Sequence, residues 1–233
     1  MKRVVLIFAL LAAFTSCKKT NPNYQQEASN PKFLERAQNM LTESIIHDIF
    51  APPVSSRIYM YANVAGYEGA IHADKRFRTF VGQLNGFEKV AQPEALALTS
   101  LAIFDGFISC WDEKYRSIRI RPETVINASI DKTWIPVLQT PPFPEYTSGH
   151  STISRAAAEV LTKVYGDNVA FNDSTEVPYG LPPRKFTSFI QASDEASVSR
   201  LYGGIHFRPA LDEGAIQGSK VGQWLLANVK TRK

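Results

Sequence analysis

The 233-residue sequence contains little cysteine, histidine or methionine, with two, four and three residues of each type. Two cysteines cannot form the disulfide framework of a small secreted domain, and a 44% hydrophobic content excludes a wholly disordered chain. A large excess of either charge is also missing, because the formal net charge is +4 and falls to +2 without Lys2 and Arg3. A charge this small gives no electrostatic case for a nucleic-acid partner. The composition indicates one globular domain, with two small domains as the alternative, and a single core at this length buries roughly 70% of the unfolded chain's surface.

The N-terminus has the pattern of an export signal. Residues 1–16 combine a positively charged start with an apolar run that is too short to span a bilayer. The run leads to Cys17 in a Phe-Thr-Ser-Cys sequence that resembles the lipobox of bacterial lipoproteins, in which the cysteine is lipidated. We expect a signal peptide over residues 1–16, a polar tether over residues 17–30, and an exported protein anchored to a membrane through Cys17, in the periplasm or on the cell surface. The alternative is an ordinary secretory signal that contains a cysteine.

Apolar residues recur at helical spacing along most of the chain. They predict helices at residues 31–50, 53–72, 94–119, 148–165, 185–202 and 211–230. No alternating strand pattern of useful length occurs, so we predict an all-α fold with the helices packed as a bundle. Residues 31–93 are expected to form an N-terminal helix pair with a polar linker, and residues 94–233 the main bundle.

The first motif that carries chemistry lies at the end of the helix predicted over residues 94–119. Lys114 and Arg121 are seven residues apart, which is close to two helical turns, so both cations can project from one face. A lysine point charge beside a planar, bidentate arginine suits a tetrahedral oxyanion such as phosphate. Taken alone, such a pair is more often a solvated basic helix end.

The second motif is Ser148-Gly149-His150, between a proline-rich loop and an apolar helix. The first turn of that helix offers backbone N–H groups and a positive dipole end to an anion. Gly149 lets the backbone approach a ligand closely, Ser148 adds a hydroxyl donor, and His150 can donate or accept a proton near pH 7. Plain N-capping beside an incidental histidine is the alternative interpretation.

The third motif runs from Ser199-Arg200 through two glycines to His206, with Asp212 further along. Arg200 is another donor for an oxyanion, and His206 is a candidate nucleophile or metal ligand. A single histidine beside an aromatic residue is usually structural, but the two other motifs change its context.

The three motifs form an ordered set, which reads Lys114-x6-Arg121-Pro122, then Ser148-Gly149-His150, then Ser199-Arg200-x5-His206. This set resembles the superfamily of type 2 phosphatidic-acid phosphatases, bacterial nonspecific acid phosphatases and vanadium haloperoxidases. The resemblance covers about residues 94–225 and implies a helical bundle of the acid phosphatase/vanadium haloperoxidase type. Residues 30–92 resemble the N-terminal helices of longer bacterial members. Those members carry additional helices between the parts that meet here near Pro93 and Glu94, so we expect a chain shortened in its middle.

The resemblance also implies roles for individual residues around a phosphate or vanadate ion. It implies that the equatorial oxygens are held by Lys114, Arg121, Ser148, Gly149 and Arg200. His206 is then the nucleophile of a phosphatase or the protein ligand to vanadium, and His150 the acid/base group. The family's orienting acid usually follows the histidine by four residues, where this chain has Ala210, so Asp212 is expected to replace it. The family also has proline where this chain has Thr147.

Two aromatic residues bear on the choice between the activities. Trp111 and Phe143 occupy positions at which vanadium chloroperoxidases resemble this sequence, and an aromatic wall suits a halide or hypohalite better than a bulky charged ester. We therefore expect a vanadate-dependent haloperoxidase that oxidises halide with hydrogen peroxide. One alternative is an acid phosphatase that hydrolyses phosphomonoesters or lipid phosphates through a phosphohistidine without a cofactor. The other is a catalytically weak lipoprotein that binds an oxyanion. For the two aromatic rings, the alternative is that both are ordinary core residues.

Three further residues match no motif. Cys110 lies within an apolar helical run and is expected to be a buried, inert thiol. His47 and His72 lie on the first two predicted helices, and we interpret them as structural or surface residues.

Overall fold

The computed structural model describes residues 31–47, 59–60, 63–64, 66–67, 76–79, 94–174, 177 and 180–231. The predicted signal peptide, the tether with Cys17, His72 and most of the helix predicted over residues 53–72 lie outside the described residues. The chain divides into two compact units, Met1–Ala37 and Gln38–Lys233. The candidate functional residues described below all belong to the second unit.

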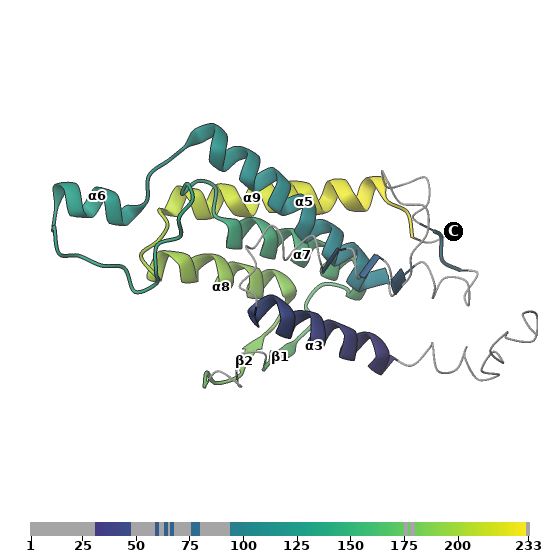
Figure 1. The fold of residues 1–233 in the computed structure, drawn as a ribbon. Coiled ribbons are helices and arrows are strands. Elements are labelled where there is room, and N and C mark those ends of the chain that lie inside the picture. The colour runs from purple at the N-terminus through teal and green to yellow at the C-terminus, as the bar shows by residue number, and fades with distance from the viewer. Residues whose placement is uncertain are drawn as a thin grey trace, which may run out of the picture. The chain divides into compact units, whose positions relative to one another are not determined.

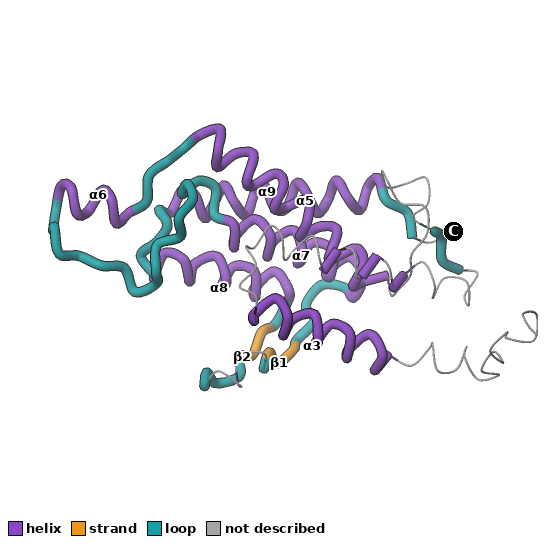
Figure 2. Tube along the Cα trace, in the orientation of Figure 1, coloured by secondary structure: helices purple, strands orange, loops and turns teal. Residues whose placement is uncertain are grey.

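The predicted all-α class is confirmed, because helices account for nearly all of the regular structure in the described residues. The helices are α3 (Pro31–His47), α5 (Glu94–Ser117), α6 (Pro122–Ser129), α7 (Gly149–Tyr165), α8 (Phe189–Tyr202) and α9 (Arg208–Asn228) (Figure 1). A short antiparallel pair of strands, β1 (Phe171–Asp173) and β2 (Arg184–Phe186), connects α7 to α8 (Figure 2). Neither strand was predicted, nor was α6.

The bundle is organised around α7, which packs against α5, α8 and α9 (Figure 1). Its core contains buried apolar side chains from α5, α7 and α9, together with residues 60, 64 and 67 from the described part of the second predicted helix. The stretch Ala95–Ser129, which includes α5, is long and apolar enough to cross a membrane by length and composition alone. Leu98, Leu101 and Ala102 of α5 are nevertheless buried in the core, so its apolar face is explained by packing within the bundle.

Glycines on one face of α9 allow it to lie unusually close to α7. Gly214, Gly218 and Gly222 are spaced four residues apart, so they share one side of the helix. A Cβ built on Gly218 would lie 2.1 Å from the carbonyl oxygen of Thr152, and one on Gly214 would lie 2.9 Å from that of Ser148. Only glycine fits at these positions, and the contact fixes the N-terminal end of α7 against the start of α9.

Local sequence signals explain where the helices begin. The hydroxyl of Ser148 caps α7 by accepting a hydrogen bond from the backbone N–H of Ser151, and Ser188 caps α8 in the same way. The predicted start of α8 at residue 185 was therefore four residues too early, since residues 184–186 form β2. Helix α9 begins at Arg208, before the predicted residue 211, because Pro209 is favourable in a first helical turn.

Candidate functional site

The three motifs predicted to act together lie at one end of the bundle, where α5, α7 and α8 meet the start of α9 (Figure 1). Lys114 is in the last turn of α5, Arg121 precedes α6, and Arg200 is in the last turn of α8. The loop over residues 143–147 leads into α7 and contributes backbone carbonyls that contact both Lys114 and Arg121. The fold thus collects cationic side chains around this loop.

Lys114 is completely buried, which is rare for a lysine. Its Nζ donates to the carbonyl oxygens of Pro144 at 2.9 Å, Glu145 at 3.0 Å and Thr147 at 2.6 Å. Burial, together with the neighbouring charge of Arg121, lowers the pKa of Lys114 from 10.5 to about 8, against opposing influences from Cys110 and Glu145. The ammonium is therefore mostly charged at neutral pH and is held by three carbonyls.

Arg121 is also buried, and all three nitrogens of its guanidinium donate hydrogen bonds. Nε and Nη2 each donate to the carbonyl of Phe143 at 3.1 Å, and Nη1 donates to the carbonyl of Ile205 at 2.8 Å. Nη1 also lies 3.0 Å from Nε2 of His206. Burial lowers the pKa of Arg121, but arginine remains charged at any physiological pH. The planar fork thus joins the loop before α7 to the turn that carries His206.

His206 is held on its other side by a carboxylate that sequence reasoning did not single out. Its Nδ1 lies 2.8 Å from Oε1 of Glu145, and the same oxygen accepts a hydrogen bond from the backbone N–H of Phe207 at 3.0 Å. Glu145 and His206 are both buried. Because a carboxylate only accepts, Nδ1 carries the proton and Nε2 has the lone pair, which accepts from Arg121.

Electrostatics favours the neutral form of this imidazole. Burial and the charges of Arg121 and Lys114 lower the pKa of His206, and the hydrogen bond and charge of Glu145 oppose that shift. At neutral pH His206 therefore presents an unprotonated Nε2, as a nucleophile or a ligand requires.

The prediction that Asp212 orients His206 was wrong. Asp212 is exposed on α9, where its Oδ1 lies 3.7 Å from Nη1 of Arg208. Two residues earlier, Ala210 is buried and its carbonyl accepts a hydrogen bond from the backbone N–H of Ser148 at 2.9 Å. The start of α9 thus braces the N-terminus of α7, and the carboxylate for His206 comes from the loop instead.

A weak sequence signal marked Glu145. It is an acidic residue in a proline-rich loop, three positions before the Ser-Gly-His motif. No periodicity indicates which way a side chain in such a loop points. The backbone N–H of Glu145 donates to the carbonyl of Arg119 at 2.9 Å, and this contact with the α5–α6 connection accompanies the inward direction of the carboxylate.

Ser148 and Gly149 form the N-terminal end of α7, as the motif predicts. Ser148 is buried, and a Cβ on Gly149 would lie 3.4 Å from the ring of Trp111, so a larger residue would press on that ring. The first N–H groups of a helix have no partner within it and mark a positive dipole end. This end therefore faces the cationic cluster with donors of its own.

His150 and Arg200 lie at the rim of the cluster. His150 keeps an exposed edge, yet desolvation by the surrounding protein and then the charges of Arg200, His206 and Lys114 lower its pKa from 6.5 to about 4. Burial also lowers the pKa of Arg200, whose Nε donates to Oγ of Ser199 at 3.1 Å. His150 is accordingly neutral at pH 7 and can either accept or donate a proton.

Trp111 and Phe143 form an aromatic wall beside the two buried cations. Their ring centroids are 5.0 Å apart, and Phe107 continues the cluster 5.1 Å beyond Trp111. Lys114 Nζ lies 5.6 Å from the Trp111 ring and 5.4 Å from that of Phe143, which is within the range of cation–π attraction. The rings exclude water from one side of the cations.

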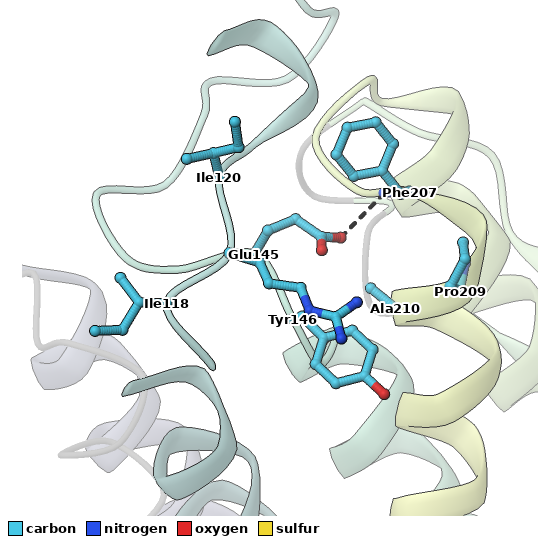
Figure 3. Close-up of a pocket in the computed structure, with 8 residues that line it drawn as sticks. Ile118, Ile120, Glu145, Tyr146, Phe207, Pro209 and Ala210 are labelled. Atoms are coloured by element: carbon cyan, nitrogen blue, oxygen red, sulfur yellow. Dashed lines mark hydrogen bonds between the residues drawn. The ribbon is translucent and has the colours of Figure 1, made fainter. Parts of the chain in front are cut away.

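A cavity of about 470 Å³ opens next to Glu145. Figure 3 shows Ile118 and Ile120 on one side of it and Phe207, Pro209 and Ala210 on the other, with the carboxylate of Glu145 directed at the backbone of Phe207. Arg119 and Tyr146 complete the lining, with the Arg119 guanidinium 4.0 Å from the tyrosine ring centroid. Glu145 thus lines the cavity, whereas His206 is not among its lining residues.

Comparison with known proteins gives one family match. The family described as the VCPO second helical-bundle domain matches residues 94–232. No curated protein matches the chain significantly.

Solved structures of bacterial vanadium-dependent haloperoxidases are also similar to this chain. The crystal structure of a bacterial vanadium-dependent iodoperoxidase is 60% identical over 60% of this chain and 34% of its own, with a TM-score of 0.59. The holo-type structure of a bacterial vanadium-dependent chloroperoxidase covers 89% of this chain and 50% of its own, at 18% identity and a TM-score of 0.51, and so shows a similar fold only. The chain spans a third to a half of the length of these proteins.

Proposed function

We propose that this chain, which belongs to the vanadium haloperoxidase and acid phosphatase superfamily, is a haloperoxidase that binds vanadate at His206 and oxidises halide with hydrogen peroxide. The observation that carries the proposal is a neutral histidine, fixed by Glu145 with its Nε2 lone pair directed into a cluster of cations. The match covers only 34% and 50% of the two relatives, so the activity of the whole enzymes is a proposal for this chain.

The residues of the cluster fit an oxyanion in charge. Lys114, Arg121 and Arg200 contribute three positive charges, and the carboxylate of Glu145, which is hydrogen-bonded to His206, acts through its negative charge on Lys114 and Arg121. Two positive charges therefore remain uncompensated in surroundings where charge is costly. A bound anion of charge about −2 would balance them.

The donors also fit vanadate in kind. The hydroxyl of Ser148 and the N–H of Gly149 add neutral donors beside the cations, and Nε2 of His206 is a ligand atom for the metal centre. Bound vanadate supplies an electrophilic centre at which hydrogen peroxide is activated towards halide. Arg121 donates to Nε2 in the structure, so its Nη1 must release that lone pair when His206 takes up a ligand.

Each of the remaining residues has a task that its environment supports. The ring of His150, whose pKa is lowered to about 4, is neutral near pH 7 and would be the acid/base group that holds or gives up a proton beside bound vanadate. Glu145 keeps the proton of His206 on Nδ1. Trp111 and Phe143 keep one side of the cations dry, which strengthens their attraction for the anion.

Iodide is the halide that we propose. The structure that is 60% identical over 60% of this chain is described as an iodoperoxidase. Iodide is also easier to oxidise than bromide or chloride, so its oxidation requires the least oxidising power at the site.

The test is an assay of the full chain loaded with orthovanadate. We expect oxidation of iodide by hydrogen peroxide, loss of activity on removal of vanadate, and loss by several orders of magnitude in His206→Ala. Arg116→Ala is a matched control, because Arg116 is exposed and pairs with Asp112 and Glu113 on the surface of α5. An active His206→Ala variant would contradict the assignment of this site.

Phosphoester hydrolysis is the second candidate, because a neutral Nε2 among cations is also suited to attack on phosphorus. Release of nitrophenol from its phosphate ester, inhibited by vanadate and absent with His206→Ala, would support it. If the loaded protein then oxidised no halide, the phosphatase assignment would replace the haloperoxidase one. Vanadate binding with neither activity would leave an oxyanion-binding lipoprotein.

We also propose that Cys17 is lipidated and anchors the exported protein to a membrane. The supporting feature is the Phe-Thr-Ser-Cys sequence after an apolar run. Cys17→Ser should move the protein from the membrane fraction to the soluble fraction, and intact-mass analysis should show loss of the acyl chains.

A further inference from the structure

A chain of polar side chains connects the loop before α7 to α5 and α9. The hydroxyl of Thr147 donates to Oε1 of Gln217 on α9 at 2.5 Å, and Nε2 of that glutamine donates to Oγ of Ser109 on α5 at 2.8 Å. Thr147 is buried, and it is the residue that stands where the superfamily has proline. Gln217 is half-buried and lies on α9 between the glycines that contact α7.

Thr147 is connected to the oxyanion-binding groups on both sides. Its carbonyl accepts the shortest of the three Lys114 hydrogen bonds, at 2.6 Å. Its chain neighbour is Ser148, which begins the anion-binding end of α7. A shift of Thr147 would therefore move a carbonyl on Lys114 and two donors, Ser148 and Gly149, at once.

We propose that Gln217 is a positioning residue for oxyanion binding, which holds Thr147 in place and so takes over the stiffening that proline gives other members of the superfamily. This inference rests on the proposed function, since it concerns the same site. Proline stiffens a loop by fixing φ and has no side-chain donor. A threonine hydroxyl bound to a glutamine that is itself held by Ser109 can fix the same residue through hydrogen bonds from two helices.

Cys110 is a weaker hydrogen-bond partner of Thr147 than Gln217 is. Its sulfur lies 3.5 Å from both the hydroxyl and the carbonyl oxygen of Thr147. A thiol is a weak partner in either direction. The single hydroxyl proton of Thr147 is better placed on the amide oxygen of Gln217, which is 1 Å closer.

The test is the vanadate dissociation constant of the full chain, measured well below the unfolding temperature together with the ⁵¹V NMR signal of the bound ion. Gln217→Ala and Thr147→Val should each weaken binding by about tenfold, which is the scale of one buried hydrogen bond. The double variant should bind no more weakly than the weaker single variant, because both changes break the same contact. Thr147→Ser keeps the hydroxyl and should bind like the wild type.

Gln223→Ala is the matched control. Gln223 lies on the same helix, and its exposed amide donates to Oγ of Ser219, so vanadate affinity and the NMR signal should not change. Wild-type affinity in Gln217→Ala, additive losses in the double variant, or a loss in Thr147→Ser equal to that in Thr147→Val would each overturn the proposal.

The proposal can fail separately from the haloperoxidase assignment. If the wild type binds orthophosphate but not vanadate, the haloperoxidase assignment fails, and the same variants titrated with orthophosphate test Gln217. If the wild type binds neither anion, there is no oxyanion site for Thr147 to position, and both proposals are wrong.

Discussion

Oε1 of Glu145 lies 2.8 Å from Nδ1 of His206, and this contact joins two buried side chains that are 61 residues apart in the sequence. The pair decides which imidazole nitrogen carries the proton, and with it whether Nε2 can bind or attack. A substitution of Glu145 should therefore change which ring nitrogen of His206 carries the proton.

We predict that Glu145→Gln lowers vanadate affinity and haloperoxidase activity by about 10- to 100-fold, the usual cost of losing a partner of a ligating histidine. The glutamine can still fill the space, but its NH₂ group can favour the wrong tautomer, with the proton on Nε2. Titration with vanadate and kcat/KM for iodide are the measurements.

Asp212→Asn is the companion variant, because Asp212 is the acid that sequence reasoning assigned to His206. Its carboxylate is exposed and lies 3.7 Å from Arg208, so both quantities should stay at the wild-type level. A loss in Asp212→Asn with none in Glu145→Gln would reverse the assignment made from the structure.

The sequence predicted Asp212 as the partner of His206, whereas the structure shows Glu145, and the difference has a physical reason. Helical periodicity placed Lys114 correctly near the end of a helix, but α5 ends at Ser117 and Arg121 precedes α6. The two cations therefore meet at the loop before α7 through the connection between these helices and not on one helix face. An offset from His206 cannot identify an acid on a separate loop, since tertiary packing alone sets that distance. Strands of three residues, such as β1 and β2, are likewise too short to show an alternating pattern.

Arg121→Lys should weaken both folding and anion binding. The guanidinium of Arg121 contacts the carbonyls of Phe143 and Ile205 and Nε2 of His206 through three nitrogens, a span that one ammonium cannot cover. We expect the free energy of unfolding to fall by about 2 kcal/mol, as buried acceptors lose their donors.

Chemical denaturation measures this loss, and vanadate titration should show weaker binding in the same variant. Arg116→Lys provides the control, because Arg116 is exposed and its change should cost less than about 0.5 kcal/mol. Equal stability of the two variants would mean that the fork of Arg121 does not hold the loop to the His206 turn.

The lowered pKa of His150 predicts a specific loss of stability in acid. The ring takes up a proton near pH 6.5 in the unfolded chain but only near pH 4 in the folded protein. Between these values the unfolded state binds more protons, so stability falls as the pH drops from about 6.5 through about 4.

His150→Gln cannot titrate and should lack this contribution. Unfolding temperatures of wild type and variant, measured from pH 7 to pH 4, should show a smaller decrease for the variant, and all other groups cancel in the comparison. Parallel curves would show that burial, together with the charges of Arg200, His206 and Lys114, does not lower the pKa of His150.

The close contact of α9 with α7 predicts that Gly218→Ala destabilises the bundle. The new Cβ would lie 2.1 Å from the carbonyl oxygen of Thr152, so the helices must separate, at a cost of about 1–3 kcal/mol. Separation would also move Gly214 away from Ser148 and disturb the anion-binding end of α7, so vanadate affinity should fall together with the unfolding temperature.

Gly106→Ala on α5 is the contrasting change, because its Cβ would meet Ile153 and Ala156 at ordinary distances of 3.6–3.7 Å. That variant should be as stable as the wild type or more so, since alanine favours a helix interior by roughly 0.5–1 kcal/mol over glycine. A stable Gly218→Ala protein with unchanged affinity would show that α9 does not set the position of Ser148.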